Sequence, residues 1–174
     1  MIDQNPSSAS PPDDSNFPAS PLAALGWDAH WAAAFAAHAP PGTTPARVIA
    51  RHRGRWVISG AGGERDAVLA GRLRHASAPE DFPTVGDWVA AMDGGGDGAA
   101  VIAGVLPRRS AFVRKAAGET TTAQVMAANV DVALVLTSPD DLSARRIERY
   151  LTLAWESGAV PVVALTKADA CGDV

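Results

Sequence analysis

Between Pro45 and Leu106 the sequence alternates apolar and polar residues through five short segments, and this pattern constrains the fold most strongly. Glycine, proline and aspartate separate the segments, as expected of turns between strands. The predicted strands are residues 46–53, 55–60, 66–75, 86–92 and 99–106. Because five short antiparallel strands must hide their edges, we predict a closed OB-fold β-barrel, with an SH3-like barrel as the main alternative. The glycine-rich stretch GAGGERD at residues 60–66 is interpreted as a hairpin turn.

A second pattern begins at residue 130, where the run VDVALVLT is nearly all apolar. Such a run is typical of a parallel strand buried on both faces. Asp141 or Ser143 can cap a following helix, and Gly158 can end it. Residues 160–165 form a second predicted buried strand, which completes one βαβ unit. We therefore expect an α+β multidomain chain. The helix residues expected to face inward are Ile147, Tyr150, Leu151, Ala154 and Trp155.

The remaining segments complete the predicted organisation. Residues 1–21 hold five prolines and five serines with almost no large apolar side chains, so we predict a disordered tail. The barrel domain is predicted at 45–107, a connector at 108–124 and an incomplete α/β domain at 125–174. Residues 22–41 are predicted to form an alanine-rich helix that caps the barrel with an aromatic face made of Trp27, Trp31, Phe35 and His38.

The formal net charge of −4 conceals a basic middle third. Residues 45–115 carry eleven basic and seven acidic side chains, whereas the segments on either side are net acidic. A small barrel rich in guanidinium groups is suited to following a phosphate backbone, so we predict RNA binding; the alternative is a solvated strand face. Trp56 and Trp88 are each interpreted as core residues, and a base-stacking platform is the less favoured alternative. The candidate RNA-binding residues are Arg47, Arg51, Arg53 and Arg55, which share strand parity and should project from one face, with Arg72, Arg74, Arg108 and Arg109.

Several classes of protein are disfavoured by the sequence. No stretch approaches 18 uncharged apolar residues, so no membrane span is predicted. The first basic residue is Arg47, which argues against a secretory signal. The single cysteine, Cys171, offers neither an intrachain disulfide nor a zinc cluster. We expect a cytoplasmic monomer with no membrane partner.

The tetrapeptide TKAD at residues 166–169 directly follows the second predicted buried strand. Ligands of α/β nucleotide-binding domains bind at the carboxyl ends of such strands. A carboxylate there can accept hydrogen bonds from N1–H and the 2-amino group of guanine, which adenine cannot supply. A lysine two residues earlier can lay its alkyl chain along the base. The alternative is an ordinary loop lysine and aspartate.

Five segments in order carry a resemblance to a known family. They are VGDWV (85–89), VLPRRSAFVRKAAG (105–118), AANVDVALVLTS (127–138), RRIERYL (145–151) and PVVALTKAD (161–169). As an ordered set they resemble the ribosome small subunit-dependent GTPases, the RsgA/YjeQ/EngC family, over roughly residues 22–174. That family has an N-terminal OB-fold, a circularly permuted GTPase domain and a C-terminal zinc-binding region.

The resemblance assigns roles to the TKAD residues. In the permuted order the guanine motif, NKxD or TKxD, precedes the phosphate loop, which accounts for TKAD with no GxxxxGKS or GxxxxGKT sequence before it. It implies that Asp169 reads the guanine edge and Lys167 packs on the base, while Thr166 stands where asparagine is usual. The resemblance implies that full-length family members bind GTP or GDP with Mg²⁺ and hold a structural Zn²⁺.

The resemblance implies a GTPase that acts in late maturation of the small (30S) ribosomal subunit. The barrel would bind ribosomal RNA, and the full-length protein would hydrolyse GTP to GDP. The sequence stops before the family's phosphate loop, switch segments, DxPG motif and zinc ligands, so we expect this chain alone to hold no catalytic residue or metal and to lack GTPase activity. The alternative function is a standalone OB-fold RNA-binding module with a vestigial α/β segment.

Overall fold

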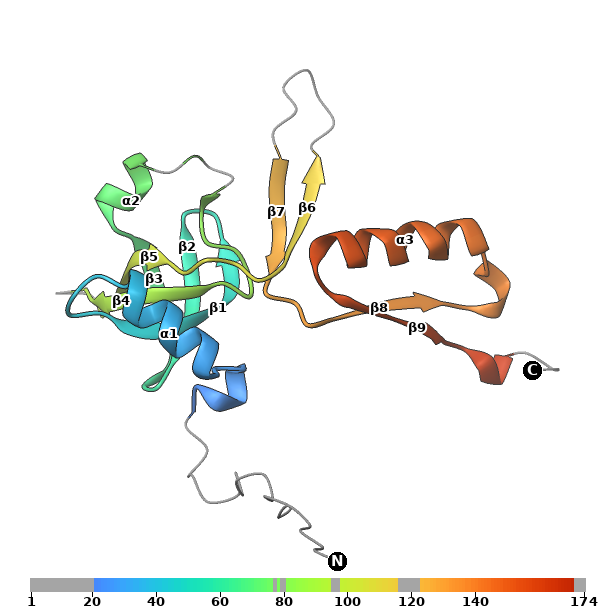
Figure 1. Cartoon of the computed structure of the whole chain (residues 1–174), viewed down its shortest axis with the longest axis horizontal. Coiled ribbons are helices and arrows are strands. Elements are labelled where there is room, and N and C mark those ends of the chain that lie inside the picture. Colours follow the sequence, from blue (N-terminus) through green and yellow to red (C-terminus); the bar gives the residue numbers. More distant parts are fainter. Residues whose placement is uncertain (1–20, 77, 79–80, 95–97, 116–122, 171–174) are drawn as a thin grey trace, which may run out of the picture.

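The computed structural model describes residues 21–170 apart from 77, 79–80, 95–97 and 116–122. Cys171 and residues 1–20 of the predicted tail lie outside these described residues. Figure 1 shows a β-barrel at one end, a βαβ unit at the other and a β-hairpin rising between them.

Five strands close into a barrel in the order β1-β2-β3-β5-β4. The closing pairs are antiparallel between β1 and β4 and parallel between β3 and β5, and helix α2 lies between β3 and β4 in the chain. This arrangement confirms the predicted OB-fold barrel, which leaves no open sheet edge along its wall. The bounds are β1 Thr44–His52, β2 Arg55–Gly60, β3 Gly63–Leu69, α2 Gly71–Ala76, β4 Trp88–Asp93 and β5 Ala100–Val105.

The barrel interior follows from the period of two along each strand. Alternate side chains point inward, and the large ones pack into one buried cluster. Trp56 is among them, and its indole Nε1 donates a hydrogen bond to the Pro83 carbonyl at 2.8 Å. The other large members are Val48, Ile58, Val89 and Ile102.

The predicted strand over residues 66–75 is wrong beyond Leu69. Ala70 leaves the barrel with its N–H bonded to the Ile102 carbonyl at 2.9 Å, and α2 then begins at Gly71. Leucine and arginine favour helices, and four alternating residues are too few to distinguish a strand from one helical turn. Arg72 and Arg74 therefore lie on a helix.

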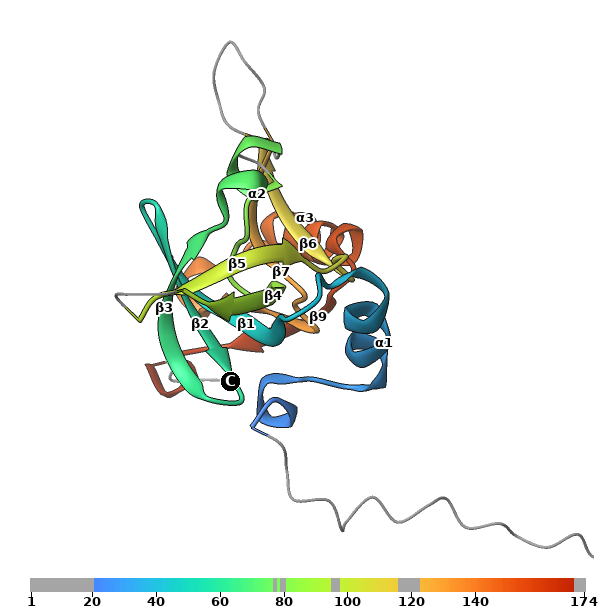
Figure 2. The same cartoon turned by 90° about the vertical axis from the view of Figure 1, so that its left-hand side faces the viewer.

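The N-terminal segment packs on the outside of the barrel, as Figure 2 shows. It is not one helix from residue 22: a 3-10 turn, η2 (Ala23–Leu25), precedes α1 (Ala29–His38). Asp28 caps α1 by accepting a hydrogen bond from the Trp31 N–H at 3.0 Å. The predicted aromatic cap is confirmed in part: Trp27 and Trp31 contact the buried Trp88 ring, with centroids 4.7 and 6.1 Å apart, and Phe35 packs beside them. Trp27 precedes α1, however, and His38 is exposed, so these two residues do not share one buried helix face with Trp31 and Phe35.

The segment predicted as a connector contains a strand. Strands β6 (Ala111–Lys115) and β7 (Ala123–Ala128) form an antiparallel hairpin. Beyond it, β8 (Val132–Thr137) and β9 (Val160–Leu165) pair in parallel and α3 (Ala144–Ser157) joins them, which confirms the predicted βαβ unit. Two 3-10 turns follow the strands, η4 (Pro139–Asp141) after β8 and η5 (Ala168–Ala170) after β9.

Two burial predictions for this unit are wrong. Leu134 and Leu136 of β8 are 59% and 61% exposed, because α3 covers only one face of the two-stranded sheet. On α3, Ala154 is buried as predicted, but Tyr150 and Trp155 point into solvent. Gly158 ends α3 in the left-handed conformation, with φ of 90°.

Candidate functional site

A basic groove of about 660 Å³ lies where the barrel, α2 and β7 meet. Arg51 enters it from the end of β1, Arg53 from the turn between β1 and β2, and Arg74 from α2. All three side chains are exposed. No carboxylate is among the described residues that line it. The structure thus brings three of the eight predicted RNA-binding arginines to one place.

The opposite wall of the groove is more apolar and comes from a distant part of the chain. Met126 lies on β7 and Val85 precedes β4, and both are exposed. Gln124 adds an amide beside them. Sequence reasoning missed these residues, because nothing local indicates that residue 126 lies near residue 53. These residues come close together only when the chain folds.

The predicted common parity of the arginines fails because β1 contains a bulge. The pairing of β1 with β2 shifts between Val48 and Ala50. One extra residue reverses which face every later side chain occupies. Arg51 therefore lies opposite the core residue Trp56, at the mouth of the barrel, whereas Arg47 lies opposite Trp88 on the outer face.

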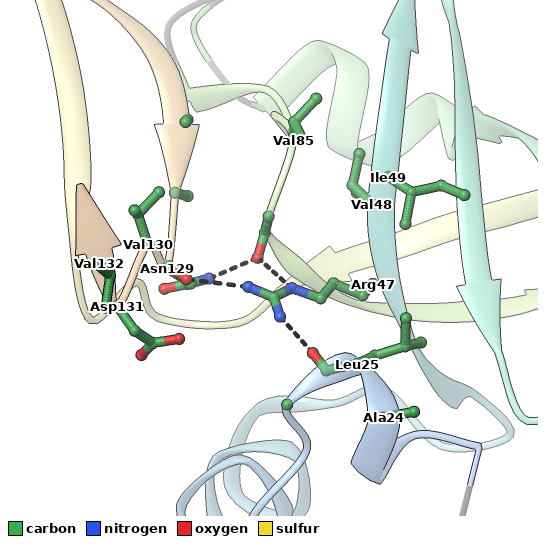
Figure 3. A pocket seen from close by; sticks show the side chains of 14 residues that line it. Ala24, Leu25, Arg47, Val48, Ile49, Val85, Asn129, Val130, Asp131 and Val132 are labelled. Atoms are coloured by element: carbon green, nitrogen blue, oxygen red, sulfur yellow. Dashed lines mark hydrogen bonds between the residues drawn. The ribbon is translucent and has the colours of Figure 1, made fainter. Parts of the chain in front are cut away.

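Arg47 is half-buried and bonded to neighbouring segments, as Figure 3 shows. Its guanidinium group donates hydrogen bonds to the backbone carbonyls of Leu25, Gly86 and Asn129, the last two at 3.3 and 3.0 Å. It also lies 5.6 Å from the centroid of the Trp88 ring. These bonds give Arg47 a structural role, and we leave it out of the RNA-facing set.

Arg108 is likewise engaged. Its Nε and Nη2 atoms each donate to the carboxylate of Asp87 at 2.8 Å, and that carboxylate is fully buried. The hydrogen bond with Asp87 raises the pKa of Arg108, although burial acts in the opposite direction. Thr84 N–H donates to the same carboxylate at 2.8 Å. The group is a bidentate internal ion pair, and we also leave Arg108 out of the RNA-facing set.

The three remaining arginines lie outside the groove. Arg109 pairs with Asp28 at 2.8 Å and stacks 5.0 Å from the Trp31 ring centroid, so that it holds α1. Arg55 is exposed, 4.0 Å from Asp66, and Arg72 is exposed on α2.

The guanine motif lies at the carboxyl end of the βαβ sheet. Thr166 follows β9, and both its N–H and its hydroxyl donate to the Thr137 carbonyl at the end of β8, at 2.8 and 3.1 Å. Lys167 has a φ of 56°, in the left-handed region, and its side chain is exposed. Asp169 is exposed within η5. The threonine hydroxyl thus ties the loop to the neighbouring strand.

Among the described residues, no group of three or more His, Cys, Asp or Glu side chains could hold a metal ion. None of the helices in the described ranges has the length and apolarity needed to cross a bilayer.

Known proteins resemble this chain over most of its length. The family model described as RsgA GTPase matches residues 105–174. The chain is 42% identical over 155 residues to the small ribosomal subunit biogenesis GTPase RsgA of Syntrophotalea carbinolica, covering 84% of this chain and 42% of that protein. For the proteins of the same name from Opitutus terrae and Streptomyces coelicolor the identity is 44%, over 85% and 88% of this chain and 43% and 41% of theirs. The chain thus spans about two-fifths of the length of these curated relatives.

Solved structures show the same fold. YjeQ from Thermotoga maritima matches with a TM-score of 0.59 and 21% identity, over 75% of this chain and 44% of that one. YloQ, described as a circularly permuted GTPase, matches with a TM-score of 0.55 and 20% identity, over 75% and 43%. Because the curated relatives are at least 42% identical to it over 84% or more of its length, this chain belongs to the RsgA family.

Proposed function

We propose that this chain recognises ribosomal RNA of the small subunit with its basic groove and the guanine base of GTP with residues 166–169. Its curated relatives are named small ribosomal subunit biogenesis GTPases, which supports a role in maturation of the small subunit. Hydrolysis of GTP to GDP, with Mg²⁺, would belong to the whole protein. The observation that carries the RNA proposal is the gathering of Arg51, Arg53 and Arg74 in one groove without an acidic lining residue.

The groove has the chemistry of an RNA site. Exposed guanidinium groups can bind successive phosphates, and the apolar wall at Val85 and Met126 can contact base or sugar surfaces. The net charge of −4 does not oppose this, because phosphate binding depends on the local concentration of positive charge.

RNA binding can be measured by fluorescence anisotropy with a labelled 16-nucleotide single-stranded RNA, competed by purified small and large ribosomal subunits. Each phosphate contact to a single strand contributes about 0.7 to the slope of log affinity against log salt. Replacing Arg51, Arg53 and Arg74 with alanine should therefore reduce that slope by about 2 and weaken binding at low salt. Small subunits should compete better than large ones.

A matched control removes the same charge elsewhere. Arg65, Arg145 and Arg149 lie outside the groove, and their replacement with alanine should leave the salt slope nearly unchanged. Equal losses in the two triple variants would mean that net charge alone governs binding, and the groove proposal would fail.

Guanine recognition can be measured by saturation-transfer NMR with guanosine, inosine and adenosine. Inosine lacks the 2-amino group, so the carboxylate of Asp169 should favour guanosine over both analogues. Asp169→Ala should abolish this preference, whereas Asp140→Ala, which removes an exposed carboxylate from η4, should keep it. Wild-type protein that does not discriminate among the three nucleosides would refute the assignment.

A further inference from the structure

Three of the segments that carry the family resemblance meet at one point in the structure. They are residues 85–89 before and within β4, residues 105–110 at and after the end of β5, and residues 127–131 at and after the end of β7. None of these three segments belongs to the guanine motif at residues 166–169, so guanine recognition does not explain why they resemble the family. Asn129 lies where they meet, and Figure 3 shows it beside Arg47.

Asn129 is 6% exposed, and its polar groups are bonded to barrel residues Arg47 and Gly86 and to Arg109 and Ser110, which lie between β5 and β6. Its N–H donates to the Ser110 carbonyl at 2.9 Å, and its Oδ1 accepts from the Arg109 N–H at 2.8 Å. Its Nδ2 donates to the Gly86 carbonyl at 3.0 Å, and its own carbonyl accepts from Arg47 at 3.0 Å. A φ of 54° places it in the left-handed region, which asparagine tolerates better than most residues.

The residues around Asn129 repeat the same connection. The Ala128 N–H donates to the Val85 carbonyl at 2.9 Å. The Ser110 hydroxyl accepts from the Val130 N–H at 2.8 Å and donates to the Val130 carbonyl at 3.0 Å. A Cβ at Gly86 would come within 1.9 Å of the Ala128 oxygen, so the two backbones approach too closely for any side chain there. The contact is therefore specific in shape as well as in polarity.

The cluster is continuous with the RNA groove on one side and with the βαβ unit on the other. Val85 and Met126, on the apolar wall of the groove, are one and three residues from Gly86 and Asn129. The βαβ unit begins at Val132, and β9 is tied to the same segment because the Val160 N–H donates to the Asp131 carbonyl at 2.9 Å.

We propose that Asn129 is a positioning residue that locks β7 and the start of β8 against the barrel. It sets the width of the basic groove and makes the barrel and the βαβ unit move as one body. The first consequence rests on the proposed RNA-binding function, whereas the second does not.

The test compares the wild-type 174-residue chain with Asn129→Gly, since glycine keeps the left-handed backbone but removes the amide. Backbone ¹⁵N relaxation should give one correlation time for the barrel and βαβ amides in wild type, and two shorter ones in the variant. Affinity for the 16-nucleotide RNA should fall about three- to thirtyfold. Asp140→Gly, which introduces glycine at an exposed position in η4 away from this contact, is the control and should change neither measurement.

A second variant covers the case in which Asn129→Gly does not fold. Ser110→Ala removes both side-chain bonds to Val130 and should loosen the same contact. Two correlation times in wild type, or one correlation time in every folded variant, would overturn the proposal. Separate tumbling in the variants without RNA binding by wild type would support the positioning role and refute the RNA function instead.

Discussion

At the scale of single residues, the arginines of this chain divide by what surrounds their guanidinium groups. Arg51 and Arg53 face solvent in a groove, whereas Arg108 is bonded to a carboxylate that has no contact with water. The first kind can exchange water for phosphate at little cost. The Arg108 guanidinium cannot leave its partner without leaving the buried Asp87 carboxylate unpaired.

Arg108→Met should lower the free energy of unfolding by about 3 kcal/mol, because it strands the Asp87 carboxylate in the interior. Arg109→Met should change it by less than about 1 kcal/mol, since its partner Asp28 is half exposed. Urea unfolding followed by tryptophan fluorescence measures both. Similar effects of the two substitutions would contradict the assignment of Asp87 and Arg108 as a buried pair.

The same pair should be insensitive to moderately alkaline solution. The pKa of Arg108 is raised in the folded chain, so its stabilising contribution is complete below the unfolded pKa and is lost only above the folded one. The stability difference between wild type and Arg108→Met should therefore be constant from about pH 7 to about pH 10. A difference that declines over that range would show that another group titrates with the pair.

Gly86 is required by its surroundings. Its φ of 93° and the 1.9 Å approach of a Cβ to the Ala128 oxygen predict that Gly86→Ala lowers the free energy of unfolding by about 3 kcal/mol or more. Gly62→Ala is the matched control, because nothing lies within 4 Å of its Cβ, and it should be nearly neutral. Thermal unfolding of the two variants separates these outcomes, and comparable melting temperatures would disprove the steric argument.

At the scale of secondary-structure elements, the barrel and the sheet of β8 and β9 differ in how many of their faces are covered. The barrel strands enclose one interior, so their inward side chains are nearly inaccessible. Strands β8 and β9 form a two-stranded parallel sheet with α3 on one face. The same kind of apolar residue therefore contributes very differently to stability in the two places.

Ile58→Ala and Leu134→Ala test this difference. Ile58 is 1% exposed inside the barrel, so its truncation should cost about 2–4 kcal/mol of unfolding free energy. Leu134 is 59% exposed, and its truncation should cost less than about 1 kcal/mol. Urea unfolding of both variants is sufficient, and a large effect at Leu134 would show that this face is covered in solution.

At the scale of the whole molecule, a closed barrel is connected to a sheet with open edges. A backbone amide in the barrel exchanges its hydrogen only when the enclosed structure opens, whereas an amide at a free strand edge is already close to water. Native-state hydrogen exchange should therefore be slowest in β1, β2 and β4 and faster in β8 and β9. Uniform protection across the barrel and the βαβ unit would contradict this and indicate a single cooperative unit.

Local pattern was sufficient for much of the architecture. Period-two alternation identified most of the barrel, the apolar runs identified β8 and β9, and Gly158 marked the end of α3. These features depend on residues a few positions apart, which local sequence can encode. The position of TKAD at a strand end follows from the same reasoning, because it immediately succeeds an apolar run.

The groove and the cluster at Asn129 were decided only by the tertiary structure. A single bulge in β1 separates Arg47 from Arg51, and no composition or spacing indicates where a bulge will fall. Whether an arginine binds a carbonyl, a buried carboxylate or solvent depends on segments up to 82 residues away, such as Asn129 for Arg47. The sequence thus determined which elements form and which family they belong to, whereas long-range packing determined which charges remain free, because desolvation is a property of the assembled fold.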